Sequence, residues 1–358
     1  MQRVRALVEC GYSAAMRISV IDVGSNTVRL AVADAVGGAP LPVHTAKRRL
    51  RLSQLVGPSR ELGPEAVERL ADAVATARAE AGRWGSGEPY VFATAVVRDA
   101  PNRDEILRTV RAETGVPLQV LPGEVEAELI FLAARRWMGW RAGPLAVLDI
   151  GGGSLEVAFG RGRLPDFAVS LPLGANRLTR EHLHDQDVPS EKALKAMRRR
   201  IRHELRDVAA RIQWEAPLTA AATSRTFCQL GRLCGAAPGR HGPFADRRLR
   251  RRALGEAVEQ LSALPAARRS ELPGISAPRA TQSLAGALVG HTAMKLMGLE
   301  SLTLCPWAIR EGLLLRRIED PDAWQHELHA DEDEGTQSGR QLWLAAGGGK
   351  DGGTGHSE

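Results

Sequence analysis

The stretch Ile21-Asp22-Val23-Gly24-Ser25-Asn26-Thr27 has a counterpart later in the chain, Leu148-Asp149-Ile150-Gly151-Gly152-Gly153-Ser154. Each stretch follows an apolar run, 18–21 in the first case and 145–148 in the second, and each is followed by another apolar run. This pattern predicts a strand that ends at an aspartate, a tight glycine turn and a returning strand. The chain therefore contains two similar hairpins, about one small domain apart.

The residue types in these two turns are suited to binding phosphate. Glycines let backbone amides approach an anion closely, and serine or threonine adds hydroxyl donors. An aspartate at the end of a strand can hold a hydrated magnesium ion among phosphate groups. Two such turns indicate duplicated lobes that clamp a phosphate chain between them.

Further motifs follow in a fixed order between residues 93 and 312. They are Ala93-Thr-Ala-Val-Val-Arg-Asp-Ala100, Pro122-Gly-Glu-Val-Glu-Ala127, Leu171-Pro-Leu-Gly174, Ala222-Thr-Ser-Arg-Thr226 and Arg310-Glu-Gly312. With the two turns, they make the chain from about residue 17 to 316 resemble the exopolyphosphatase / guanosine-pentaphosphate phosphohydrolase family. The segments 171–175 and 305–308 are most similar to short actinobacterial members.

The resemblance implies an α/β fold of two actin-like (ribonuclease H-like, ASKHA) domains with a cleft between them. The sequence agrees, because predicted strands at 89–93 and 118–121 alternate with predicted helices at 65–81, 104–113 and 124–137. Long helices are expected at 190–214 and 277–298, and a closing helix at 309–317. We expect domain I at 16–140 and domain II at 141–320.

The two ends of the chain are expected to lie outside these domains. Residues 1–15 lack an adequate apolar core for a signal peptide, so we interpret them as a mis-assigned start or a loose arm. Residues 321–358 are acidic and then rich in Gly, Ser and Gln, a composition that favours disorder. Four scattered cysteines and the lack of a membrane-length apolar run predict a cytoplasmic protein with reduced thiols. We also expect a homodimer.

The net charge is +6, and arginine supplies most of the positive charge. Two dense arginine clusters lie at 198–202 and 247–252. They are either solvated helix faces or a track for a polyanion. No aromatic stacking platform or helix-turn-helix pattern accompanies them, so polyphosphate fits better than nucleic acid.

Hydrolysis of a phosphoanhydride needs a group that accepts a proton from the attacking water. Glu126 is the candidate, because the resemblance places it at the position of the family's catalytic glutamate. The alternative is an acid that complements the helix dipole. Many relatives carry a second acid where this chain has Val125. The nearby Glu124 is also acidic, so it is the alternative to Glu126 for the role of base. The loss of that acid is expected to alter metal affinity or rate.

The other site residues are assigned through the two turns. The resemblance implies that Asp22, Asp149 and Glu156 organise Mg²⁺, or alternatively Mn²⁺, although each aspartate could simply form a turn. The turns themselves are expected to bind substrate phosphates through Gly24, Ser25, Asn26 and Thr27 on one side and Gly151, Gly152, Gly153 and Ser154 on the other.

Two arginines complete the predicted site. Arg98 is expected to reach a phosphate with its forked donors, and the alternative is an ion pair with Asp99. Arg225 stands where many relatives have glycine, so it either reaches the substrate or narrows the space for a nucleoside. Glu311 and Gly312 match the last motif of the family, which we expect to support the cleft.

The function implied by the resemblance is that of a magnesium-dependent exopolyphosphatase, which releases terminal orthophosphate from inorganic polyphosphate. Two alternatives remain open. One is the same chemistry on guanosine pentaphosphate. The other is a weakly active sensor that binds polyphosphate or guanosine penta- or tetraphosphate. A sugar kinase or actin-like ATPase is disfavoured by Glu126 within its motif together with Arg98.

Overall fold

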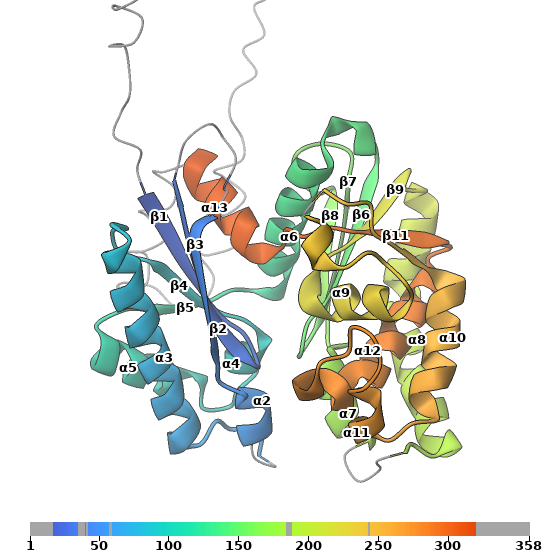
Figure 1. Cartoon of the computed structure of the whole chain (residues 1–358), viewed down its shortest axis with the longest axis horizontal. Coiled ribbons are helices and arrows are strands. Elements are labelled where there is room, and N and C mark those ends of the chain that lie inside the picture. Colours follow the sequence, from blue (N-terminus) through green and yellow to red (C-terminus); the bar gives the residue numbers. More distant parts are fainter. Residues whose placement is uncertain are drawn as a thin grey trace, which may run out of the picture.

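The structure, a computed structural model, describes residues 17–34, 40, 42–56, 59–183, 188–242 and 244–319. The expected N-terminal extension 1–15 and C-terminal tail 321–358 lie outside these residues. Two lobes stand side by side, each built on its own sheet (Figure 1). Within the described ranges, no helix is long and apolar enough to cross a membrane.

The first lobe contains a five-stranded sheet of order β3-β2-β1-β4-β5. Its strands are β1 (Arg17–Val23), β2 (Thr27–Asp34), β3 (Pro42–Arg49), β4 (Tyr90–Ala93) and β5 (Leu118–Val120). The first three are antiparallel, whereas β4 is parallel to both β1 and β5. The helices are α2 (Leu52–Leu55), α3 (Pro64–Arg83), α4 (Ala95–Arg98), α5 (Arg103–Thr114), α6 (Gly123–Met138) and the short η1 (Trp140–Ala142).

The second lobe repeats this topology and adds one edge strand, giving the order β10-β11-β9-β6-β7-β8. Its strands are β6 (Leu145–Ile150), β7 (Leu155–Gly160), β8 (Phe167–Leu171), β9 (Thr219–Ala222), β10 (Arg248–Arg250) and β11 (Ser301–Leu304). Here β6, β7 and β8 are antiparallel, and β9 is parallel to β6 and β11. The prediction of duplicated α/β lobes is therefore confirmed.

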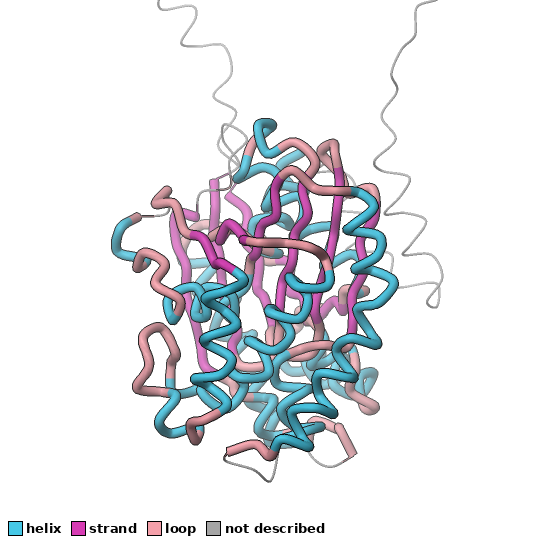
Figure 2. The backbone as a smooth tube through the Cα atoms, turned by 90° about the vertical axis from the view of Figure 1, so that its right-hand side faces the viewer, coloured by secondary structure: helices cyan, strands magenta, loops and turns pink. Residues whose placement is uncertain are grey.

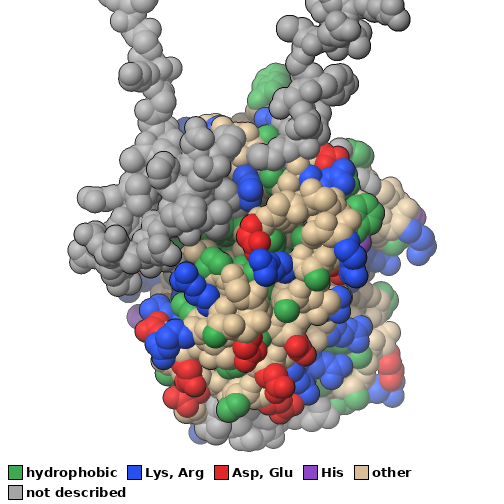
Figure 3. All heavy atoms as spheres, turned by 90° about the vertical axis from the view of Figure 1, so that its left-hand side faces the viewer, with side chains coloured by type: hydrophobic (Ala, Val, Ile, Leu, Met, Phe, Trp, Pro, Cys, Tyr) green, Lys and Arg blue, Asp and Glu red, His purple; other side chains and the backbone are tan. Residues whose placement is uncertain are grey.

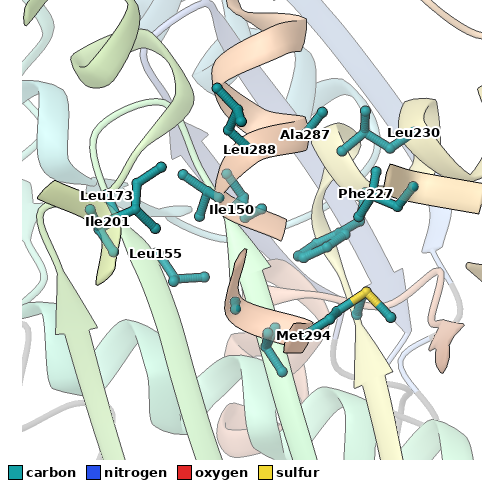
Figure 4. Packing of buried hydrophobic residues seen from close by; sticks show 14 of the residues in the cluster. Ile150, Leu155, Leu173, Ile201, Phe227, Leu230, Ala287, Leu288 and Met294 are labelled. Carbon is teal, nitrogen blue, oxygen red and sulfur yellow. The ribbon is translucent and has the colours of Figure 1, made fainter. Parts of the chain in front are cut away.

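Helices cover the second sheet, as the side view in Figure 2 shows. They are α7 (Ala175–Leu183), α8 (Glu191–Glu215), α9 (Ser224–Leu233), α10 (Arg251–Ser262), α11 (Ala266–Arg269) and α12 (Ala280–Leu296), with η2 (Gly239–His241) and η3 (Ala277–Arg279) between them. Helix α12 is apolar on nearly all sides, so it lies in the centre of the lobe. Its Leu288 and Met294 pack with Phe227 and Ile150 in a mainly aliphatic core (Figure 4).

Two helices connect the lobes. Leu129 of α6 belongs to an apolar cluster of the first lobe, while its neighbour Phe131 packs against the second sheet. The closing helix α13 (Ile309–Glu319) crosses back, and its Leu313 joins Ile18 in the first-lobe cluster (Figure 1). Gly312 makes this docking possible, because a Cβ there would overlap the backbone of Leu129. The domain limits 16–140 and 141–320 stay predictions, and α13 packs on the lobe opposite to the one expected.

Candidate active site

The two predicted turns adopt the same closed form. The Gly24 amide donates to the Thr27 carbonyl at 3.0 Å, and the Gly151 amide donates to the Ser154 carbonyl at 2.9 Å. Each turn joins the central strand of its sheet to the next strand, β1 to β2 and β6 to β7. The duplicated sequence pattern therefore produces duplicated geometry.

Both turns line one cleft of about 370 Å³. Nearly all of the predicted site residues line it as well: Asp22, Gly24, Ser25, Asn26, Thr27, Glu126, Asp149, Gly151, Gly152, Gly153, Ser154, Glu156 and Arg225. The exception is Arg98, which is not among the lining residues. The expectation that the glycine turns face each other across one groove is confirmed.

The turns approach each other so closely that larger residues would not fit. A Cβ on Gly152 would overlap the Ser25 hydroxyl, and a Cβ on Gly153 would lie 2.6 Å from the Ala95 side chain. Behind the second turn, Gly174 lies against the backbone of Gly152 and leaves no room for a side chain. These glycines keep the cleft narrow and expose main-chain amides to it.

Four carboxyl groups lie on the floor of the cleft: the buried Glu126, Asp149 and Glu156 and the half-buried Asp22. Burial raises the pKa of each of them above its ordinary value. The Glu156 carboxylate raises the pKa of Glu126 and of Asp149 further, and the pKa of Asp149 reaches about 7. A cation bound among these groups would relieve the cost of keeping them ionised.

Hydroxyl groups orient two of these acids. The Thr223 hydroxyl donates to Asp149, and the Ser170 hydroxyl donates to Glu156 at 2.9 Å. No role was predicted for Thr223 from the sequence. A signal was present, because β4 and β9 both end at an alanine that is followed by a threonine, and Thr94 and Thr223 share one extended backbone conformation.

Glu126 lies in the first turn of α6 and is only 4% exposed. Glu124 is exposed and lines a separate hollow, so only Glu126 faces the cleft. Val125 packs in the apolar cluster that contains Leu129 and Leu313. The side chain at position 125 therefore points into the core, which gives no support to the expectation that Val125 affects the metal directly.

Arg98 does not line the cleft but contacts one of its acids, Glu126. Its guanidinium forms an ion pair with Glu126 and donates to the Leu121 carbonyl at 3.0 Å. It also lies 3.5 Å from Asp99, so the alternative interpretation from the sequence is present as a secondary contact. The expected contact of Arg98 with a phosphate stays a prediction.

Four arginines also line the cleft, close to the acids. They are Arg29, Arg225, Arg279 and Arg310, of which only Arg225 was predicted from the sequence as a site residue. Burial and then the neighbouring Arg29 and Arg225 lower the pKa of Arg279 to about 10. Among the described residues, no carboxylate lies within ion-pair distance of Arg29, Arg225 or Arg279. These three arginines therefore carry positive charge available for an anion.

The strand registers show that the two hairpins contribute different charges to the cleft. In the first hairpin Asp22 lies opposite Arg29, whereas in the second Asp149 lies opposite Glu156. Equivalent positions of the duplicated hairpins thus hold a cation in one lobe and an acid in the other.

Oxygen ligands are what Mg²⁺ prefers, and the acids provide them. Among the described residues, no group of three or more His, Cys, Asp or Glu side chains is arranged as a ready metal cage. Mg²⁺ is usually bound by one or two carboxylates together with waters and substrate phosphates. The residues present fit that mode, while the specific ligand assignments stay predictions.

Comparison with known proteins gives a consistent result. Residues 31–320 match the model of the Ppx/GppA phosphatase family. This chain belongs to that family. An uncharacterised protein of Streptomyces coelicolor is 70% identical over 89% of this chain and 95% of its own length. Exopolyphosphatase 1 of Mycobacterium tuberculosis is 45% identical over 85% of this chain and 89% of its own length.

Solved structures of the Ppx/GppA family agree with the fold. The crystal structure of an exopolyphosphatase from Cytophaga hutchinsonii matches with a TM-score of 0.76 at 22% identity, covering 85% of this chain and 98% of that one. The predicted actin-like α/β fold is therefore confirmed.

Proposed function

We propose that this protein is an exopolyphosphatase, which hydrolyses the terminal phosphoanhydride bond of inorganic polyphosphate and releases orthophosphate. The observation that carries this proposal is that one cleft holds both a group of carboxylates and a group of arginines beside the two glycine turns. The arginines suit a charged chain, and the carboxylates suit a cation and the activation of a water molecule. The names of the mycobacterial relatives support the same activity.

The chain's own residues divide the work. Main-chain amides within the turns 24–27 and 151–154, other than those of Gly24 and Gly151 that close the turns, donate to the oxygens of the terminal phosphates. Glu126 accepts the proton of the attacking water, and its raised pKa suits that role. Arg98 holds the Glu126 carboxylate in place through their ion pair. The next phosphates of the chain bind to three arginines of the cleft, Arg29, Arg225 and Arg279.

Mg²⁺ is the cofactor that we propose, with Mn²⁺ as the alternative. Asp22, Asp149 and Glu156 would hold it, directly or through water, between the two turns. When bound, the ion would neutralise charge that develops on the phosphate oxygens. Addition of EDTA should abolish phosphate release, and Mg²⁺ should restore it.

Polyphosphate is favoured over guanosine pentaphosphate by the lining of the cleft. None of the described residues that line it is Phe, Tyr or Trp, so the cleft offers no aromatic platform for a base. The large Arg225 side chain also occupies space beside the turns. The same features disfavour a sensor of guanosine nucleotides.

The test is phosphate release from long-chain polyphosphate and from guanosine pentaphosphate, measured side by side at equal concentrations with Mg²⁺. Polyphosphate should be the better substrate by kcat/KM, and Arg225→Gly should narrow the difference. Equal or better turnover of guanosine pentaphosphate by the unaltered protein would establish the alternative. Binding of polyphosphate with no turnover of either substrate would establish the sensor.

We also propose that the protein acts in the cytoplasm as a homodimer. Cys228, Cys234 and Cys305 are free thiols, which is compatible with a reducing compartment. Light scattering after size-exclusion chromatography should give twice the mass of the chain. A monomer at micromolar concentration would contradict the second half of this proposal.

A further inference from the structure

A second basic hollow lies on the second lobe, away from the cleft. It is a groove of about 540 Å³ between helices α8, α10 and α12. Its charged lining consists of Arg198 and Arg202 of α8, Arg252, Glu256 and Glu259 of α10 and Lys295 of α12. We call it the outer groove. None of its lining residues belongs to the cleft.

Three of its cations are available to a ligand. Arg198 and Arg202 are four residues apart on α8, so they lie on the same face of that helix. Neither of them, nor Lys295, has a carboxylate within ion-pair distance among the described residues. Arg252 is highly exposed and interacts with Glu256 at 3.3 Å.

The cations of the groove differ from several other arginines of the sequence clusters 198–202 and 247–252, which have partners within the protein. Arg200 pairs with Glu204, and Arg251 pairs with Glu300. Arg247 instead donates to backbone carbonyls, including that of Pro238 at 2.9 Å. Charge from two segments distant in the sequence thus meets in one groove, while their remaining arginines mostly serve the fold.

A phosphate chain matches the chemistry of the outer groove. Cations close together without acid partners repel one another, and a flexible polyanion relieves that repulsion. None of the described residues that line the groove is Phe, Tyr or Trp, and the only ring among them is that of His291, which makes a poor platform for stacking successive bases. By contrast, the hollow between α3 and α5 on the first lobe is acidic, with Glu68, Asp72, Glu105 and Glu113 in its lining, and acidic side chains gather on that face (Figure 3).

Helix α12 links the outer groove to the cleft. It begins at Ala280, directly after Arg279 of the cleft, and Lys295 lies in its last turn. At 1.5 Å per residue, its 17 residues span about 26 Å. A ligand must therefore be long to contact both places, and a short phosphate chain bound in the cleft does not reach the groove.

We propose that the outer groove is a second binding site for the polyphosphate chain, which holds a distal segment while the terminal phosphate lies in the cleft. This inference rests on the proposed function and adds a site to it. Binding at two linked places raises the apparent affinity for long chains, because the second contact is intramolecular. Short chains gain nothing from it.

The kinetic test uses the triple variant R198Q/R202Q/K295Q. Its matched control is R69Q/K195Q/R206Q, which removes the same charge at exposed residues that pair with neighbouring acids. The groove variant should raise KM for long-chain polyphosphate by about 10-fold or more, within the range of avidity effects. It should leave kcat/KM for tripolyphosphate unchanged, and the control should alter neither. An equal loss with tripolyphosphate, or no change with the long chain, would overturn the proposal.

The binding test uses Glu126→Gln protein, so that the chain is not consumed. Adding the groove substitutions should weaken binding of long-chain polyphosphate and flatten its dependence on salt, without weakening that of tripolyphosphate. Single-stranded RNA of equal charge should compete poorly, and equal competition would overturn the assignment to polyphosphate. If the unaltered protein releases no phosphate from any chain, the proposed function fails, whereas the groove is judged by this binding measurement alone.

Discussion

The guanidinium of Arg98 forms an ion pair with the carboxylate of Glu126 at the floor of the cleft. The pKa of Glu126 is therefore set by opposed influences. Burial raises it most, the neighbouring Glu156 raises it further, and Arg98 lowers it. A general base must be deprotonated to act, so Arg98 keeps Glu126 usable at lower pH than burial alone would allow.

Replacing Arg98 with Gln should move the acidic limb of the pH profile upward. Removing the cation removes the main influence that lowers the pKa of Glu126, so the base deprotonates at higher pH. The shift in kcat/KM should be about 1–3 pH units, the usual effect of one adjacent opposite charge. Arg98→Lys, which keeps a positive charge, serves as the control and should shift the limb less. An unmoved limb would mean that Glu126 is not the titrating base.

Glu126→Gln should reduce kcat by at least about 100-fold, the scale expected for loss of a general base. The matched control is Glu124→Gln, two residues away on the same helix but exposed and outside the cleft. That control should retain most activity, since it changes the same charge without touching the site. Circular dichroism and polyphosphate binding should be unchanged in both. A larger loss in the control would transfer the role of base to Glu124.

Much of the fold followed from local sequence patterns. Strand and helix patterns located both hairpins, β4, β5 and the helices α3, α5, α6, α8, α12 and α13, but not β3, β8 to β11, α7 or α9 to α11. The repeated Asp-x-Gly turn predicted the duplicated lobes, and with the family resemblance it predicted most of the residues that line the cleft. Such features are visible because each depends on a short continuous segment. The α13 helix was located correctly at 309–317, but its packing on the first lobe was not predicted. Docking depends on a close approach between Gly312 and Leu129, which local periodicity does not report.

The site residues that the sequence did not reveal were missed for different reasons. Arg29 could have been found, because it lies seven residues after Asp22, as Glu156 lies seven residues after Asp149, and the hairpin registers place the members of each pair opposite each other. Arg279 enters the cleft from the end of η3, just before α12, and the spacing of residues along the chain does not indicate that position. The partner of Arg98 was also missed, because α4 and α6 meet only in the folded lobe.

Gly174→Ala should damage the phosphate-binding turn from behind. The added methyl group would overlap backbone atoms of Gly152 and Gly153, which cannot move aside as a side chain can. We expect a loss of about 1–3 kcal/mol in the free energy of unfolding, as for other overpacked sites, together with a lower kcat/KM. Gly162→Ala is the control, because a Cβ there meets nothing within 4 Å. Denaturant titration and phosphate release measure the two effects, and a fully active, equally stable Gly174→Ala protein would contradict the geometry.

Asp149→Asn should make the metal-free protein more stable at pH 8 while abolishing activity. The pKa of Asp149 is about 7 in the fold and 3.8 as its ordinary value. A carboxyl whose pKa is raised by folding favours the folded state below its ordinary pKa, and this advantage is lost as the pH rises to 7. Above pH 7 the buried group therefore costs up to about 4 kcal/mol, taking 1.36 kcal/mol per pKa unit. Asparagine avoids this cost and can still accept the Thr223 hydrogen bond.

The measurement is the Tm of both proteins in EDTA at pH 4.5 and pH 8. The variant should melt higher at pH 8, and the difference should become small at pH 4.5, where the Asp149 carboxyl is already protonated in the folded protein. Mg²⁺ at pH 8 should raise the Tm of the unaltered protein more than that of the variant, because the ion relieves the same buried charge. Asp34→Asn is the control, since Asp34 lies far from the cleft and its pKa is lowered, not raised, by Arg17. If Asp149→Asn melts lower than the unaltered protein at pH 8 in EDTA, the ionised Asp149 carboxylate does not destabilise the metal-free fold. The main physical reason for placing a cation beside Asp149 would then be removed.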